Sequence, residues 1–451
     1  MKNRKERCRV AKFLQQIGLL RILGLLFAFI LGFNLLSACN RQPVTLSFVV
    51  PQIEAEFWKP LIEQFEARNP NIRIDLANER QNNQKVPDST DELKREYLSD
   101  FDGSKPPSYD LVYMDIIWVP EFAEKGWLMD LTDKFDQEKL KREFLISEVD
   151  NGVYNNKLYR IPFRTDVGVL YYRKDLLKKV NEKPPETFED LFRISQNLKR
   201  QQVVEWGYLW PGQRSEGLVA MFVEILEGHG GFWINQNGDV GVDQSVAIDA
   251  VKFLRRTIEQ GISPQSLLTY SDSEVNKLFL DGEAVFLRHW PAFWVDANSD
   301  KSSIRGKIAI QPMVHAEGQG SGVCKGGWGF GITKTTKHKK EALQVIKFLT
   351  SAAAQRQFTL AYGSVPSRRK LFFDPKIVAR YSHYPELLNV IDKYWISRPR
   401  IPQYGMASCI LQEYLSKALD PVLNTYSPEE AMQKAARDTK ELLRMGTYNC
   451  P

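Results

Sequence analysis

The chain has 451 residues, with 61 lysines and arginines against 55 aspartates and glutamates, and a formal net charge of +6. The first 38 residues hold seven of the basic residues and one acid, so 54 residues of each sign remain after them. A chain without a basic surplus gives no support for nucleic-acid binding, which needs a positive surface. Its length exceeds one ordinary hydrophobic core, so we expect two lobes.

A basic leader and an apolar run open the chain. Residues 1–12 carry six basic side chains, and the run 22–36 is apolar apart from two glycines and Asn34. This layout is typical of a secretory signal peptide, and about 15 residues fall short of the roughly 20 that span a membrane. An uncleaved N-terminal anchor is the alternative reading.

The apolar run ends in Leu36-Ser37-Ala38-Cys39, which resembles the lipobox of bacterial lipoproteins. That resemblance implies that residues 1–38 are removed and that Cys39 becomes the lipidated first residue. Two or three acyl chains hold a protein on a membrane stably, where one chain does not. We therefore expect a protein anchored by its lipid in the periplasm or at the cell surface.

The other cysteines of the mature chain are Cys324, Cys409 and Cys450. Outside the cytoplasm we expect one disulfide among them, with three pairings open and one thiol left over. Neither these cysteines nor the five histidines have the paired spacing typical of metal ligands. The sequence therefore predicts neither a metal site nor a cofactor.

The first half of the mature chain alternates strands and helices. Residues 44–50 and 72–76 alternate as strands, and residues 57–68 between them have the apolar spacing of a helix. Strand, helix and strand with short links indicate a right-handed crossover and parallel pairing. Residues 81–107 predict a helix edged by polar loops, and residues 109–115 a buried strand that ends on an acid.

The alternation continues toward the C-terminus. Residues 169–177 predict a strand that leads into a helix, and residues 247–261 an amphipathic helix that stops at a glycine. Residues 283–290 predict a strand that finishes on a tryptophan. Residues 328–332 predict another strand, before a helix over residues 340–351. The predicted fold class is therefore α/β.

Seven stretches in this order carry a family resemblance: SFVVPQIEAEFWKPLIEQFEARNPNIRI, YDLVYMDIIWVPEFAEKGWLMDLT, YRIPFRTDVGVLYYRKDLL, LFLDGEAVFLRHW, GGWGFGITKTTKHKKEALQVIKFLTS, YGSVPSRRKLF and SRPRIPQY. Together they resemble the extracellular sugar-binding proteins of bacterial ABC importers (family 1 solute-binding proteins), especially the branch for trehalose, maltose and related disaccharides. Each stretch alone is a weak signal, and the ordered set of seven is a strong one.

The resemblance implies a two-lobed periplasmic-binding-protein fold, in which crossover strands join the lobes and a ligand cleft lies between them. The first crossover is expected in residues 160–170, and the second within residues 311–332. The expected N-terminal lobe is residues 39–163 with 326–372, and the expected C-terminal lobe is residues 164–325 with 373–451.

A sugar-binding cleft needs two kinds of side chain. Carboxylates and arginines bind vicinal hydroxyls, and flat aromatic rings pack on axial C–H groups. Asp115 ends a strand, and the resemblance implies a hydroxyl-binding role for it, with a helix N-cap as the alternative. Trp118 follows three residues later as a candidate for the cleft or the core. Asp166 lies at the expected first crossover, as a hydroxyl-binding acid or a turn acid, with Arg164 and Tyr171 as second choices.

The resemblance supplies the remaining candidates. Trp290, before a proline, and Trp328 are expected as stacking platforms, although Trp328 could instead fill the space between the lobes. Gly327 is expected to bring its backbone close to the ligand. Arg398 is expected to reach into the cleft, with Arg400 as its competitor. Glu54, in the first strand-to-helix loop, is a candidate ligand-binding acid or a helix-capping acid.

The sequence thus predicts a lipid-anchored, monomeric substrate-binding subunit of an ABC carbohydrate importer, for a disaccharide or glycosyl-polyol such as trehalose, maltose, sucrose or glucosylglycerol. It is expected to close by hinge motion and to deliver its ligand to a permease. The chain has no phosphate-binding G-x-x-x-x-G-K-[ST] loop, so a separate ATPase subunit is expected.

Two other functions remain open at this point. A secreted glycoside hydrolase or lyase would use paired carboxylates such as Asp115 and Asp166 as acid and base. A receptor on the same scaffold could bind a peptide, a polyamine or a metal chelate instead of a sugar. The first alternative predicts turnover of a disaccharide without a transporter. The second predicts stabilisation by amino acids or peptides and not by sugars.

Overall fold

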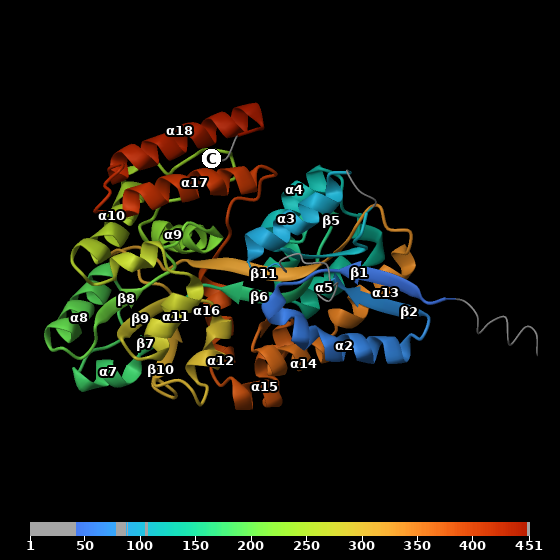
Figure 1. Cartoon of the computed structure of the whole chain (residues 1–451), viewed down its shortest axis with the longest axis horizontal. Helices are drawn as coiled ribbons and strands as arrows, with labels where there is room; N and C mark the ends of the chain where they lie inside the picture. The colour runs from blue at the N-terminus through green and yellow to red at the C-terminus, as the bar shows by residue number, and fades with distance from the viewer. Residues whose placement is uncertain (1–41, 78–86, 88, 104–106, 449–451) are drawn as a thin grey trace, which may run out of the picture.

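The structure is a computed structural model that describes residues 42–77, 87, 89–103 and 107–448 (Figure 1). The predicted signal peptide and Cys39, the predicted lipidation site, lie outside the described residues. Among the helices of the described ranges, none is both long and apolar enough to cross a membrane. Cys324 is a free, buried thiol, and Cys409 is in a disulfide bond, so Cys324 is the thiol left over.

The predicted strand–helix–strand unit opens the described fold. Strands β1 (Val44–Phe48) and β2 (Ile72–Leu76) pair in parallel, and α2 (Ala55–Arg68) joins them. The helix forms because its apolar residues recur on one face, which buries Trp58, Leu61 and Phe65. Helix α3 (Thr90–Phe101) and strand β3 (Leu111–Asp115) follow, as the sequence predicted.

Two long strands run through the middle of the molecule and connect its halves (Figure 1). They are β6 (Ile161–Val167) and β11 (Val323–Ile332), which pair antiparallel in a five-stranded sheet with β3, β12 (Val365–Pro366) and β13 (Trp395–Ile396). Every residue of β6 and β11 is buried. Both expected crossover segments therefore contain strands that pass between the lobes.

A second sheet forms the other half, in the order β10-β7-β9-β8. Its strands are β7 (Val169–Arg173), β8 (Trp206–Leu209), β9 (Ala284–His289) and β10 (Ile308–Gln311). The principal helices of this half are α8 (Phe188–Arg200), α9 (Glu216–Gly228), α10 (Ser245–Glu259), α11 (Asp272–Leu280), α17 (Tyr404–Leu419) and α18 (Pro428–Met445). Figure 1 shows α17 and α18 stacked on the outside of α9 and α10.

Shorter elements complete the described chain. The helices are α4 (Val119–Glu124), α5 (Gln137–Glu143), α6 (Ile146–Asp150), α7 (Lys174–Lys179), α12 (Trp294–Ala297), α13 (Lys339–Leu349), α14 (Ala352–Tyr362), α15 (Pro375–Arg380) and α16 (Tyr384–Tyr394). The hairpin strands are β4 (Val153–Tyr154) and β5 (Lys157–Leu158). Helix α13 and the 169–177 strand-to-helix segment lie where the sequence predicted them.

The buried apolar residues form two separate cores, which define two lobes. The first-lobe core draws on residues 46–163 and 328–358. The second-lobe core draws mainly on residues 167–323 and 365–442. Val365, Leu371 and Phe372 belong to this second core, although the sequence analysis placed residues up to 372 in the first lobe. The chain therefore enters the second lobe at or before Val365. The reason is that the short segment after α14 packs against α16 and not against the first-lobe core.

Candidate functional site

A cleft with a volume of about 380 Å³ lies where the two lobes and the crossover strands meet. This volume is in the range of small-ligand pockets. First-lobe residues such as Glu54 and Asp115, second-lobe residues such as Glu216 and Trp290, and Gly326 to Trp328 of β11 all line it. A ligand held in this cleft therefore contacts both lobes at once.

The fold brings the candidate side chains together because they lie at or near strand ends. Asp115 is the last residue of β3, and Asp166 is the second-last residue of β6. Trp290 directly follows β9, where Pro291 begins a short 3-10 turn. Side chains that follow α/β strands meet at one edge of the sheet, where such folds bind their ligands.

Arg164 organises the first-lobe side of the cleft. Its Nη2 donates to Glu54 Oε1 at 2.7 Å, and its Nη1 donates to Asp166 Oδ2. Its Nε donates to the Tyr113 hydroxyl oxygen at 3.1 Å, and that hydroxyl donates to Glu54 Oε2 at 3.0 Å. The network holds two carboxylates in fixed positions on the cleft wall, and Glu54 does not cap α2 with its side chain.

Burial shifts the acidity of the central carboxyl groups. It raises the pKa of Asp166 from 3.8 to about 7, against the lowering effect of Arg164. Negative charges on Glu54, Glu148 and Asp115 raise the pKa of Asp166 further. Burial also raises the pKa of Asp115, which Arg398 opposes. Asp166 therefore changes its charge close to neutral pH.

Arg398 occupies the far end of the cleft. Its Nη1 donates to Glu216 Oε1 at 2.7 Å, and its Nη2 donates to the Lys325 carbonyl oxygen at 3.2 Å. The same Nη2 lies 3.5 Å from Asp115 Oδ1. Glu216 also accepts from the hydroxyls of Tyr404 and Ser408. Arg398 thus ties a first-lobe acid to a second-lobe acid, and its buried Nε has no hydrogen-bond partner in the structure.

The two aromatic candidates have different surroundings. Trp328 stacks on Tyr113, with ring centroids 5.0 Å apart and an interplanar angle of 28°. Trp290 is half-buried, and the Arg288 guanidinium lies 4.2 Å from its ring centroid. The Tyr171 hydroxyl hydrogen-bonds to the backbone carbonyls of Trp290 and Pro291, and Tyr171 is itself fully buried. Trp290 therefore presents a partly exposed ring to the cleft on a fixed backbone.

Trp118 does not reach the cleft, which corrects its place among the ligand-binding candidates. Its side chain is 1% exposed and packs in the first-lobe core against Tyr97, Phe122 and Trp328. The Asp115 carboxylate accepts from the Ile117 amide and caps the 3-10 turn Ile116–Trp118, which directs the indole inward. Asp115 thus has its expected capping role while it also lines the cleft.

Two adjacent glycines shape the cleft wall in different ways. A Cβ atom on Gly326 would stand 3.3 Å from the Asp166 Cβ and 3.5 Å from the Trp290 ring, so this glycine leaves room in the cleft. A Cβ atom on Gly327 would instead stand 2.5 Å from the Glu148 carboxylate. The φ of Gly327 is +155°, which also favours glycine.

Seven of the eight ligand-binding candidates line this one cleft: Glu54, Asp115, Asp166, Trp290, Gly327, Trp328 and Arg398. The second choice Arg164 also lines it. Further lining residues that were not among the candidates include Asp91, Glu216, Gly326, Asp272, Asn276, His289 and Tyr362. Glu216 and Asp272 begin helices, and His289 ends a strand, and such places at element ends could have pointed to them. Gly326 and Asn276 lie inside β11 and α11, where no local signal marks them.

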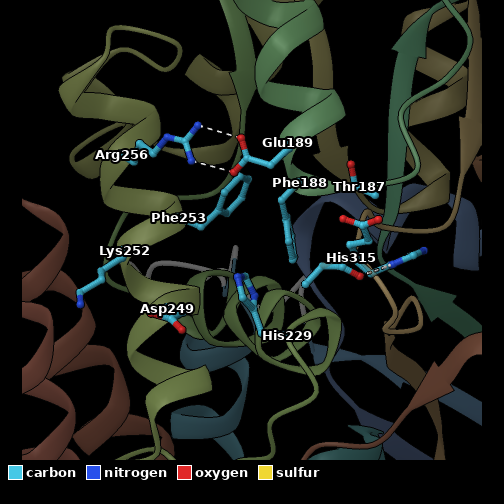
Figure 2. A pocket seen from close by; sticks show the side chains of 11 residues that line it. Thr187, Phe188, Glu189, His229, Asp249, Lys252, Phe253, Arg256 and His315 are labelled. Atoms are coloured by element: carbon cyan, nitrogen blue, oxygen red, sulfur yellow. Dashed lines mark hydrogen bonds and ion pairs between the residues drawn. The ribbon is translucent and has the colours of Figure 1, made fainter.

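A second cavity, with a volume of about 330 Å³, lies on the second lobe among α8, α9 and α10 (Figure 2). Two of its charged groups bind each other, since Arg256 donates to both carboxylate oxygens of Glu189 at 2.8 and 3.0 Å. Phe188 and His229 stack face to face, with centroids 4.3 Å apart. This cavity is lined by second-lobe residues only, so a ligand in it would contact one lobe.

The family model for bacterial extracellular solute-binding proteins matches residues 51–356 of the chain. A probable ABC transporter-binding protein of Deinococcus radiodurans is 27% identical over 303 residues, which cover 66% of this chain and 71% of that protein. The multiple sugar-binding protein of Streptococcus mutans is 23% identical over 370 residues, which cover 78% of this chain and 82% of that protein.

Solved structures share the two-lobed fold. Maltose-bound MalE3 of T. maritima superposes with a TM-score of 0.80 at 31% identity, over 89% of this chain and all of that one. A solute-binding protein of Agrobacterium radiobacter in complex with ribitol superposes with a TM-score of 0.75 at 21% identity. The superposition covers 89% of this chain and 99% of that one. At 21% identity, the similarity to the Agrobacterium radiobacter protein shows a shared fold only.

Proposed function

This chain belongs to the family of bacterial extracellular solute-binding proteins, and on that premise we propose that it is the carbohydrate-binding subunit of an ABC importer. The observation that carries the proposal is the composition of the cleft. Two tryptophans, fixed carboxylates and two arginines line one cavity between the lobes. This is the combination that sugar hydroxyls and C–H faces require.

We propose a disaccharide or a glycosyl-polyol as the ligand, in the class of trehalose, maltose, sucrose and glucosylglycerol. Asp115, Asp166 and Glu54 would accept hydrogen bonds from hydroxyls, and Trp290 and Trp328 would pack on the C–H faces of the rings. The maltose in the MalE3 complex supports this class, because that protein shares 31% of its residues with this chain. Gly327 and Arg398 complete the proposed binding set.

The same geometry suggests how binding is signalled. A ligand that contacts both lobes stabilises the closed arrangement, because those contacts exist only there. The crossover strands β6 and β11 would serve as the hinge. The closed protein would then dock on a permease whose separate ATPase subunit supplies the energy.

We also propose that Cys39 carries a lipid anchor after removal of residues 1–38. The short apolar run and the sequence Leu36-Ser37-Ala38-Cys39 support this part of the proposal. Mass spectrometry of the membrane-bound protein should show a diacylglycerol adduct on an N-terminal peptide that begins at Cys39. A Cys39→Ser variant should lack the adduct and leave the membrane fraction.

A ligand panel tests the proposed function. Maltose, trehalose, sucrose, glucosylglycerol, a dipeptide and spermidine should be titrated against the protein by thermal shift and by calorimetry. At least one of the sugars should raise the melting temperature, and chromatography should recover it unchanged after incubation. Stabilisation by the dipeptide or by spermidine alone would contradict the proposal, as would cleavage of a disaccharide.

A further inference from the structure

The cleft carries an excess of negative charge. Six carboxylates and two guanidinium groups line it. Each guanidinium already contacts two of the carboxylates: Arg164 contacts Glu54 and Asp166, and Arg398 contacts Asp115 and Glu216. The two arginines are therefore occupied within the cleft, and the remaining carboxylates, Asp91 and Asp272, have no arginine partner among the lining residues.

Asp91 and Asp272 face the cleft from opposite lobes. Asp91 is in the first turn of α3, and Asp272 is in the first turn of α11. Burial raises the pKa of Asp91, and the Glu216 backbone amide is one of the groups that oppose this rise, so that amide lies near the Asp91 carboxylate. Ser215, which precedes α9, does not cap that helix with its own side chain. Asp91 therefore lies beside the first turn of a helix of the other lobe.

The ionisable groups of the site respond to this negative potential. Burial raises the pKa of Asp91 most, and the negative charge of Glu216 raises it further. The positive charges of Arg95 and Lys94 lower this pKa. Lys94 is itself bound to Glu121 at 2.5 Å. As described above, three other carboxylates raise the pKa of Asp166. An additional anion in the cleft would meet the same repulsion.

The hydrogen-bonding groups of the cleft point to the same kind of ligand. Three N–H groups of Arg164 and two of Arg398 already donate to protein acceptors. Asn276 adds an acceptor, since its Oδ1 is buried without a hydrogen-bond partner in the structure. Hydroxyl and ammonium groups can donate to these acceptors, whereas phosphate and carboxylate groups act mainly as acceptors at neutral pH. An anionic substituent would therefore lose hydrogen bonds and also be repelled.

We propose that this cleft selects carbohydrates by charge, admitting uncharged and amino-substituted sugars and excluding phosphorylated and acidic ones, with Asp91 and Asp272 as specificity-determining residues. The inference rests on the proposed function, since it specifies the ligand class of the same site. It adds a criterion that depends on charge rather than on the identity of the sugar.

The test compares matched forms of one sugar. Maltose and trehalose should each be titrated by calorimetry as the parent sugar, as its 2-amino-2-deoxy derivative and as its phosphate monoester, at pH 7.5 and low salt. For the series that binds, we expect the phosphate form to bind at least about 30-fold more weakly than the parent. The amino form should bind at least as tightly as the parent sugar. Added salt should reduce the difference in affinity between the phosphate form and the parent.

Variants test the two residues. Asp91→Asn and Asp272→Asn should each reduce the ratio of the phosphate Kd to the parent Kd about threefold or more, because each removes one negative charge. Glu138→Gln, in the first turn of α5 and exposed, is the matched control and should keep the ratio of the wild type. Asparagine is nearly isosteric with aspartate, and circular dichroism will verify that each variant is folded.

The possible outcomes separate the two proposals. Equal affinity of the wild type for parent and phosphate forms would overturn charge selection and leave the proposed function standing. An unchanged ratio in both aspartate variants would overturn their assignment as specificity-determining residues. If no sugar of the panel binds, while the dipeptide or spermidine does, the proposed function fails and this inference falls with it.

Discussion

The carboxylate of Glu148 fills the space beside Gly327 in which a side chain would begin, with Oε1 2.5 Å from the ideal Cβ position. Glu148 is fully buried and accepts hydrogen bonds from Arg160 at 3.1 Å and from Thr165 at 2.8 Å. Lys325 Nζ lies 3.4 Å from it. A buried charge cluster behind β11, and not a ligand alone, therefore requires the glycine in this hinge strand.

Replacement of Gly327 by alanine should destabilise the protein. The new methyl group would displace the Glu148 carboxylate and occupy a φ of +155°, so we expect a loss of about 2 kcal/mol or more in the free energy of unfolding. Urea denaturation measures this loss. Gly320→Ala is the control, because nothing lies within 4 Å of its Cβ position. Equal stability of the two variants would contradict the packing described here.

The anion and the lysine of this buried charge cluster should contribute unequally to the stability of the protein. Glu148→Gln should cost about 3 to 5 kcal/mol, because it leaves the buried cations of Arg160 and Lys325 without their anion. Lys325→Met should cost far less, because Lys325 Nζ has no hydrogen bond in the structure and Arg160 continues to neutralise Glu148. Urea denaturation of both variants gives the comparison. A larger loss for Lys325→Met than for Glu148→Gln would refute the account of this cluster.

Asp166 predicts a pH-dependent stability. Its pKa in the folded protein is raised from 3.8 to about 7, so between these values the folded state binds more protons at this group than the unfolded state does. The contribution of Asp166 to stability should therefore fall as the pH rises from 4 to 7. Melting temperatures of the wild type and Asp166→Asn, measured from pH 4.5 to 8, isolate this contribution as their difference. A difference that does not change with pH would contradict the raised pKa.

Trp290 predicts a selective loss of sugar binding. Its half-buried ring lines the cleft and lies next to the Arg288 guanidinium, so Trp290→Ala removes a stacking surface and should weaken binding of the preferred sugar about 10-fold or more. Trp395→Ala is the matched control, because this tryptophan is 42% exposed and does not line the cleft. Calorimetry gives both affinities. An equal effect of the two changes would place the sugar elsewhere.

Most of the fold followed from local sequence patterns. Residues 44–76 were predicted as strand, helix and strand because their apolar spacing changes period from 2 to 3.6 and back, and the structure confirms this unit. Asp115 and Trp290 were predicted from their places at strand ends together with the family resemblance, which supplied their roles. The family resemblance supplied the two-lobed architecture, which periodicity alone does not determine.

The rest of the site depends on tertiary contacts that no local pattern encodes. Glu216 begins a helix that is apolar nearly all round, and it reaches the cleft only because that helix packs with β11 and α17. Trp118 could not be assigned to the cleft or to the core, because the sequence does not fix which side of a three-residue turn faces the core. Gly326 was overlooked because its importance lies in its distance to Asp166 and Trp290, which are remote in the sequence.

The central claim is that a carbohydrate binds in the cleft between the lobes and is not transformed there. A crystal structure of the protein with the tightest-binding sugar of the panel tests this claim most directly. The account predicts electron density for the intact sugar in the cleft, with a ring against Trp290 or Trp328 and hydroxyls within hydrogen-bonding distance of Asp115 and Asp166. Density for that sugar only in the cavity of Figure 2, or for a cleaved product, would contradict it.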